Sequence, residues 1–218
     1  MTDKKIKSAL YSSGIMFELA KKAYYRSQHD QQESLNGILL SALAFECFMN
    51  EFEDIAQDCI GQKDLHRLQT LRDIIADLEK GNAHLRIKIQ AIHYFLTLRK
   101  LSFGRAPYQD LSILIDIRNT LVHRKPEKFE WDIDNPEKEY DPHRFVKFLA
   151  DRQVIKRPPK MHPGTWSLYV IRSEVAKWAY DTAVAVIKDI AIVIPASRFA
   201  RRIHFLVRFF TEPLSKIE

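Results

Sequence analysis

Arg118 and His123 have four residues between them, and the two side chains could together perform phosphate chemistry. An arginine binds phosphate oxygens through its planar guanidinium, and an imidazole exchanges protons near neutral pH. A phosphate-binding cation and a proton-transfer group are the minimum set of groups needed to cleave RNA without a metal ion. Asn119 follows the arginine directly and lies one helical turn before His123, so a polar amide accompanies the pair.

The spacing alone is a weak signal, because chance predicts roughly two Arg-His pairs with four to six residues between them in a chain of this composition. Four such pairs are present, and the other three begin at Arg86, Arg157 and Arg198. The surroundings favour the pair at Arg118. A polar residue follows the arginine, an amphipathic helix precedes it, and Pro126 is expected to end the helix just beyond His123.

The segment Ile117-Arg118-Asn119, with Tyr108-Gln109-Asp110-Leu111 before it and His123 after it, resembles the signature of the HEPN domain (higher eukaryotes and prokaryotes nucleotide-binding). An earlier segment, residues 41–51, resembles the family's Leu/Ala-rich helix with an embedded Glu46 and Asn50. The resemblance covers roughly residues 8–193, strongly at these two helices and loosely elsewhere.

This resemblance implies an all-α domain that acts on RNA or binds partners. Many HEPN proteins are metal-independent endoribonucleases of toxin-antitoxin or phage-defence systems, and others are inactive partners or scaffolds. It also implies a homodimer with a composite site, an RNA substrate and a possible antitoxin protein as partner. No cofactor and no metal are expected.

The implied reaction is internal transesterification of RNA. A base removes the proton of a 2'-OH, the oxygen attacks the adjacent phosphorus, and the 5'-oxygen leaves, which gives a 2',3'-cyclic phosphate and a 5'-OH. His123 is the candidate general acid or base, and Arg118 is the candidate phosphate ligand. Asn119 is expected to orient the imidazole or to contact phosphate. One histidine does not easily serve both proton transfers, so two motifs across a dimer groove are expected.

Arg118 is expected at the border of the apolar face of its helix, with His123 about 140° further round. In a long helix expected over residues 32–60, Glu46, Asn50 and Glu53 fall within about 40° of one another. A buried carboxylate needs a partner, and Arg118 is the most economical one for Glu46. One alternative is that Glu46 faces solvent at the margin of its helix. A separate alternative is that Arg118 is an interior salt-bridge residue and that His123 is a C-terminal cap favoured by the helix dipole.

The chain has 218 residues, of which 46% are hydrophobic and only six are glycine. Helical spacing of its apolar residues predicts an all-α fold, an antiparallel HEPN-like bundle. The expected helices span residues 8–28, 32–60, 64–79, 84–101, 107–123, 141–151, 168–193 and 196–211. A long insert containing prolines, residues 124–167, precedes the last core helix. We assign residues 1–194 to the helical domain and residues 195–218 to a basic C-terminal helical extension.

The net charge of +6 allows a polyanionic partner. Its distribution is uneven: residues 63–105 hold nine Lys/Arg against four Asp/Glu, whereas residues 127–141 hold seven acids against two bases. An RNA-binding surface with an acidic flap is one interpretation, and an ordinary solvated surface is the other. No apolar run approaches the ~18 residues of a membrane span, so we expect a cytoplasmic protein with no membrane insertion.

Overall fold

The computed structural model describes residues 12–58, 65–81, 83–123, 142–158, 165–194 and 198–211. Within these ranges the regular structure is helical and no strand occurs, which confirms the predicted all-α class. None of the described helices is both long and apolar enough to cross a membrane. The helices are α1 (Ser12–Arg26), α2 (Gln31–Asp58), α3 (Leu65–Lys80), α4 (Leu85–Thr97), α5 (Tyr108–Val122), α6 (Arg144–Asp151), α7 (Trp166–Val170), α8 (Ser173–Val193) and α9 (Arg198–Thr211).

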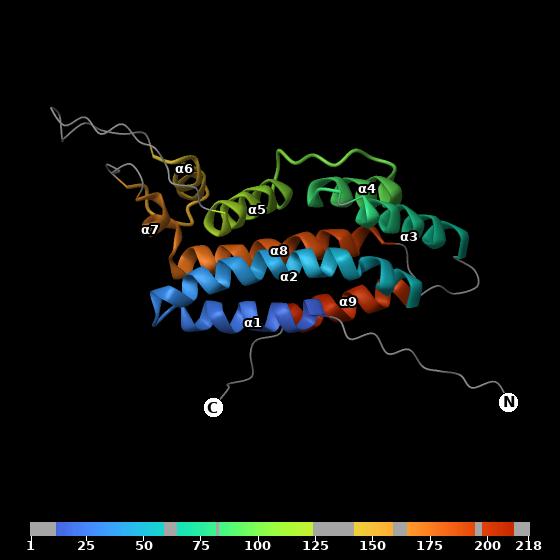
Figure 1. Ribbon diagram of the computed structural model, residues 1–218, viewed down its shortest axis with the longest axis horizontal. Coiled ribbons are helices and arrows are strands. Elements are labelled where there is room, and N and C mark those ends of the chain that lie inside the picture. The colour runs from blue at the N-terminus through green and yellow to red at the C-terminus, as the bar shows by residue number, and fades with distance from the viewer. Residues whose placement is uncertain are drawn as a thin grey trace.

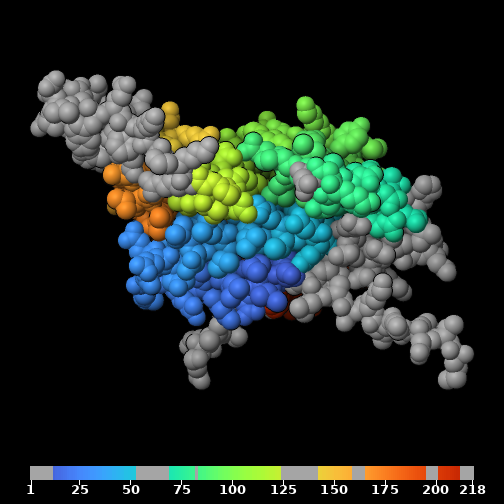
Figure 2. Space-filling model, viewed as in Figure 1, coloured from blue at the N-terminus to red at the C-terminus, as the bar shows by residue number. Residues whose placement is uncertain are grey.

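Two long helices, α2 and α8, lie side by side through the middle of the bundle (Figure 1). Helices α1 and α9 cover one side of this pair, and α4 and α5 cover the other. Helix α3 packs against α2 and α4, and α6 packs against α7. In the space-filling view, part of α5 reaches the surface beside the green helices α3 and α4 (Figure 2).

The two central helices, α2 and α8, run in the same direction (Figure 1). Helices α1 and α2 run antiparallel across the short turn between them (Figure 1). A Cβ added to Gly37, near the start of α2, would stand 2.9 Å from the Cβ of Ala176, near the start of α8. This contact brings the starts of α2 and α8 together, and Gly37 is the residue that allows their close approach. A parallel pair is possible here because the chain between them is long.

The core is built around α2, whose apolar residues recur at intervals of three and four. Ile38, Phe45, Met49 and Phe52 are fully buried on this helix. Burial of a large apolar side chain stabilises the fold by about 1.5–3 kcal/mol. The second helix therefore lies inside the bundle.

Two helix boundaries differ from the prediction for physical reasons. Helix α4 stops at Thr97 rather than near residue 101, because Leu98 adopts a left-handed conformation with φ 59°. The predicted helix over 168–193 is two helices, α7 and α8, separated by Ile171 and Arg172. Trp166, in α7, is buried, and its ring packs 5.4 Å from the ring of Phe145 in α6. The spacing of apolar residues along the sequence does not predict this packing of α7 against α6.

Helix α9 docks on the bundle through one apolar face. Ile203, Leu206 and Phe210 are buried, and the ring of Phe210 stacks 4.1 Å from that of Phe17 in α1. Tyr180 of α8 donates a hydrogen bond to the carbonyl of Phe210. The boundary that we assigned between the helical domain and the C-terminal extension follows residue 194. Residues 195–197, just after this boundary, lie outside the described part of the chain. The acidic segment 127–141 also lies outside it.

Candidate active site

Helix α5 carries the motif and ends at it. Pro107 occupies the N-cap position, and His123 is the C-cap residue, whose backbone N–H donates to the carbonyl of Asn119 at 2.9 Å. Leu111 and Leu114 are buried on the face toward α2 and α8, and this packing fixes the rotation of the helix. The motif therefore sits on a rigid helix whose last turn is at the surface.

Arg118 is held by two neighbours. Its Nη2 lies 2.7 Å from Oε2 of Glu46 in α2, and its Nη1 donates to Oδ1 of Asn119 at 2.8 Å. The arginine and glutamate side chains are 25% and 23% exposed, so the ion pair is only partly shielded from solvent. The structure thus shows the pair that the helical arrangement predicted. A guanidinium has five N–H donors, so Arg118 can still offer donors to a phosphate.

Asn50 belongs to a different cluster, one turn further along α2. Its side chain is exposed, and its Oδ1 accepts a hydrogen bond from Nζ of Lys88 in α4 at 3.2 Å. Lys88 also pairs with Glu79 of α3. Asn50 therefore helps to join α2 to α3 and α4, and it does not contact Arg118. The side chain of Glu53, the third polar residue of the predicted group, lies outside the described residues.

His123 is exposed at the end of α5. Within the described residues its side chain makes no hydrogen bond or ion pair, and so it is bonded neither to Arg118 nor to the side chain of Asn119. The structure therefore brings Glu46, Arg118 and Asn119 together and leaves the histidine apart from them. The helical period explains the separation, because five residues place two side chains about 140° apart.

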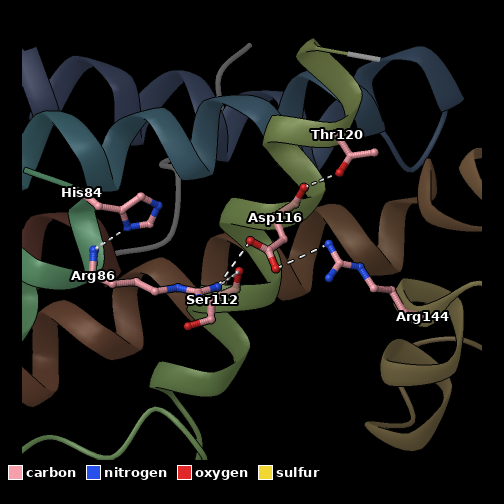
Figure 3. A network of polar contacts seen from close by, with 6 residues as sticks. All are labelled: His84, Arg86, Ser112, Asp116, Thr120 and Arg144. Atoms are coloured by element: carbon pink, nitrogen blue, oxygen red, sulfur yellow. Dashed lines mark hydrogen bonds and ion pairs between the residues drawn. The ribbon is translucent and has the colours of Figure 1, made fainter. Parts of the chain in front are cut away.

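A polar network that was not predicted from the sequence lies on the same stripe of α5 as His123. Asp116 is placed between Arg86 of α4 and Arg144 of α6, as Figure 3 shows. Asp116 and Thr120 precede His123 by seven and three residues, a spacing that puts the three on one side of a helix. That spacing was the signal available in the sequence. The two arginines come from other helices, so no local pattern could have revealed them.

An open cavity of about 770 Å³ lies elsewhere, between the start of α5 and α8. Asp110, Trp178 and Asp189 are among its lining residues. Burial raises the pKa of Asp110, while Arg152, at 2.8 Å, lowers it. We place the candidate site at the end of α5 rather than in this cavity, because the described residues that line the cavity include no histidine and no arginine.

Within the described residues, no group of three or more His, Cys, Asp and Glu side chains is arranged to hold a metal ion. His93, which pairs with Arg86 in another of the four Arg-His spacings, bonds through Nδ1 to the carbonyl of Arg99 at 3.1 Å. Comparisons of the chain with protein-family models, with curated proteins and with solved structures found no match.

Proposed function

We propose that this protein is a metal-independent endoribonuclease that cleaves RNA through attack of the 2'-OH on the adjacent phosphate. The observation that supports this proposal best is the last turn of α5. It combines a guanidinium oriented by Glu46 and Asn119 with an exposed imidazole at the helix end. Phosphate ligand and proton-transfer group thus lie on one rigid element.

In this proposal Arg118 binds the non-bridging phosphate oxygens and stabilises the charge that develops on them. Glu46 and Asn119 hold the guanidinium plane, which reduces the reorganisation needed when substrate binds. His123 takes the proton from the 2'-OH or gives one to the leaving 5'-oxygen. Its exposure leaves the imidazole accessible to an RNA strand.

The active form is proposed to be a homodimer, because His123 lies apart from Arg118 in one chain. A second copy placed against the end of α5 would supply a second histidine and bring it to the phosphate held by the first. Val122, beside His123, is 53% exposed and offers apolar surface for such a contact. The proposed setting is a toxin-antitoxin or phage-defence system in the cytoplasm.

One observation favours a different class of function. Arg118 is engaged by Glu46 at 2.7 Å, a distance typical of a strong charge-assisted bond, and within the described residues His123 forms no hydrogen bond with it. A site in this state suits an inactive protein of the same fold that works as a dimeric interaction or regulatory module. In that case the Arg118–Glu46 pair is purely structural.

Cleavage of defined RNA in the presence of EDTA tests the proposal. We expect the wild type to give products ending in 2',3'-cyclic phosphate, and the His123→Ala protein to give no visible product in the same time. His29→Ala is the matched control, because His29 is also an exposed histidine, in the turn between α1 and α2. Strict dependence on Mg²⁺, or equal cleavage by the His123→Ala protein, contradicts the proposal. Absence of cleavage by folded wild type on every RNA favours the interaction module.

A further inference from the structure

Asp116 is shared by two arginines that belong to different helices. Its Oδ1 lies 3.3 Å from Nη2 of Arg86 in α4, and its Oδ2 lies 3.6 Å from Nη2 of Arg144 in α6. Figure 3 shows the two guanidinium groups approaching the carboxylate from opposite sides of α5. One carboxylate thus faces two cations, which leaves this cluster with one excess positive charge.

Both contacts are loose by comparison with other ion pairs of the same molecule. Arg118–Glu46 and Arg152–Asp110 close to 2.7 and 2.8 Å, within the usual range for charge-assisted bonds. The contacts to Asp116 are 0.5 Å or more longer, so neither arginine makes a tight bond to it.

The two arginines retain unused capacity for an anion. The side chain of Arg144 is 66% exposed and that of Arg86 is 40% exposed. The Nε of Arg86 is buried and has no hydrogen-bond partner among the described residues. The second contact of its Nη2, to the carbonyl of Ser112, is long at 3.4 Å. An arginine binds oxyanions through several N–H groups at once. Within the described residues, both polar contacts of the Arg86 side chain run through Nη2 and are long, and Arg144 has one long ion-pair contact and lies with its guanidinium 4.7 Å from the centre of the Phe145 ring.

We propose that Arg86 and Arg144 form a binding site for a phosphate of the RNA backbone, in which Asp116 occupies the two guanidinium groups until the phosphate replaces it. The choice of RNA as the anion rests on the proposed function. The position supports it, because Asp116, Thr120 and His123 lie along one stripe of α5, and seven residues of helix span about 10 Å. A strand that is held at the two arginines and runs along this stripe reaches His123.

In this proposal, Arg86 and Arg144 bind substrate together with Arg118. Arg118 faces α2 and is held in place by Glu46, whereas Arg86 and Arg144 border the stripe that carries His123. We call Arg86 and Arg144 the clamp. The clamp orients the strand, and its members are positioning residues: they bind a neighbouring phosphate and do not touch the reacting atoms.

Binding can be measured separately from cleavage with a fluorescent single-stranded RNA whose 2'-oxygens are methylated, because that oligonucleotide cannot undergo attack by a 2'-OH. We expect Arg144→Gln and Arg86→Gln each to weaken binding roughly threefold to tenfold, and to lower the slope of log Kd against log salt by about 0.7 for each phosphate that the variant no longer neutralises. Asp116→Asn should tighten binding severalfold, because the competing carboxylate is gone.

Arg157 and Asp151 provide matched controls. They form another loose pair, at 3.7 Å, with exposures of 62% and 59%, so Arg157→Gln and Asp151→Asn make the same charge changes at a pair that does not include Asp116. Circular dichroism melting identifies any variant that fails to fold. Arg144→Gln is the decisive variant because that side chain is mostly in solvent.

Two results overturn the clamp: wild type that does not bind the methylated RNA, or Arg144→Gln and Asp116→Asn proteins that bind like their controls. If the clamp variants change binding as expected and the wild type still cleaves no RNA, the clamp stands and the proposed nuclease activity fails. If cleavage depends on His123 but the clamp variants bind normally, the nuclease stands and the clamp fails.

Discussion

Glu46 in α2 and Arg118 in α5 form an ion pair of 2.7 Å that ties the central helix of the bundle to the last turn of the motif helix. The same guanidinium also bonds to Asn119, so its plane is set by two acceptors. A structural tie and a prepared phosphate ligand look identical in the absence of substrate. Substitutions that keep the charge but change the geometry separate them.

Arg118→Lys is expected to fold and to lose cleavage. Lysine keeps the positive charge and can pair with either Glu46 or Asn119, but it lacks the planar fork that binds two oxygens at once. Stability should fall by roughly 1 kcal/mol, and the cleavage rate by about 10²-fold or more. Thermal melting and a rate assay in EDTA measure the two effects. A folded Arg118→Lys protein that cleaves at the wild-type rate would show that Arg118 is only structural.

Glu46→Gln is the companion variant, because it alters the orientation of Arg118 without touching substrate. Removing one partner of this partly exposed pair should cost roughly 1–3 kcal/mol, between the values for exposed and buried pairs. We expect cleavage to fall less than with Arg118→Lys, since the guanidinium remains. A larger loss of rate with Glu46→Gln would assign the glutamate a direct role in the reaction.

His123→Ala is expected to reduce the cleavage rate by roughly 10²- to 10⁴-fold, the usual effect of losing a general acid or base. The melting temperature should change little, because the side chain is exposed and makes no bond within the described residues. His29→Ala should match the wild type in both measurements. A loss of helicity in the His123→Ala protein would instead assign the residue a structural role at the end of α5.

A homodimer should appear in light scattering at micromolar concentration as twice the chain mass of 25.6 kDa. Val122→Asp places a charge on exposed apolar surface beside His123 and is expected to give a monomer without cleavage. Ile192→Asp is the control, because Ile192 is 75% exposed on α8, beside the cavity and away from the motif. Wild type that remains monomeric, or a Val122→Asp dimer, contradicts the composite site.

The sequence predicts helices and their buried faces well because both follow from local periodicity. The pairing of Glu46 with Arg118 was also predictable, since a carboxylate inside an apolar helix requires a cation and α5 offers one at the border of its apolar face. The partner of Asn50 was not predictable in this way. Lys88 reaches it from α4, and the position of α4 against α2 depends on packing between distant segments.

The cluster around Asp116 was missed for the same reason. Arg86 and Arg144 lie 30 residues before and 28 residues after it, and they meet it only because α4 and α6 flank α5. Helix α7 was merged with α8 because the apolar spacing continues across the break. The burial of Trp166 beside α6 decides the geometry there, and single-helix periodicity carries no information about such contacts.

Gly37→Ala is expected to destabilise the protein although alanine favours helices. The new methyl group would stand 2.9 Å from Cβ of Ala176, which cannot move without shifting α8. Overpacking of this kind typically costs about 1–3 kcal/mol. This cost equals or exceeds the ~1 kcal/mol that alanine gains over glycine in helix propensity. Urea unfolding measures the difference.

Gly14→Ala is the matched control for Gly37→Ala, because a Cβ at Gly14 of α1 meets nothing within 4 Å. That change should stabilise the protein by up to about 1 kcal/mol. Adding Ala176→Gly to Gly37→Ala should recover part of the loss, since one methyl group then occupies the contact. Equal effects of the two glycine substitutions would show that α2 and α8 do not approach as closely as described.

Tyr108→Phe should reduce the sensitivity of the fold to alkali. Burial raises the pKa of Tyr108 above its ordinary value of 10.0, and the hydrogen bond that its hydroxyl donates to Asp189 raises the pKa further. The folded protein therefore keeps a proton that the unfolded chain releases above pH about 10. The contribution of the Tyr108 hydroxyl to the stability of the fold is therefore fully present below pH about 10, and it is lost as the pH rises further.

The comparison of melting temperatures between pH 9 and 11 measures this contribution of Tyr108. Over that range, the melting temperature of the wild type should fall further than that of the Tyr108→Phe protein. At pH 8 the variant is expected to be the less stable of the two, because it lacks a hydrogen bond worth about 1 kcal/mol. Tyr180, whose pKa burial also raises, remains in both proteins, so some alkaline loss persists in the variant. Tyr94→Phe is the control, because Tyr94 is 55% exposed, and it should follow the wild type. Parallel curves for the wild type and Tyr108→Phe would mean that the hydroxyl of Tyr108 is not held by Asp189.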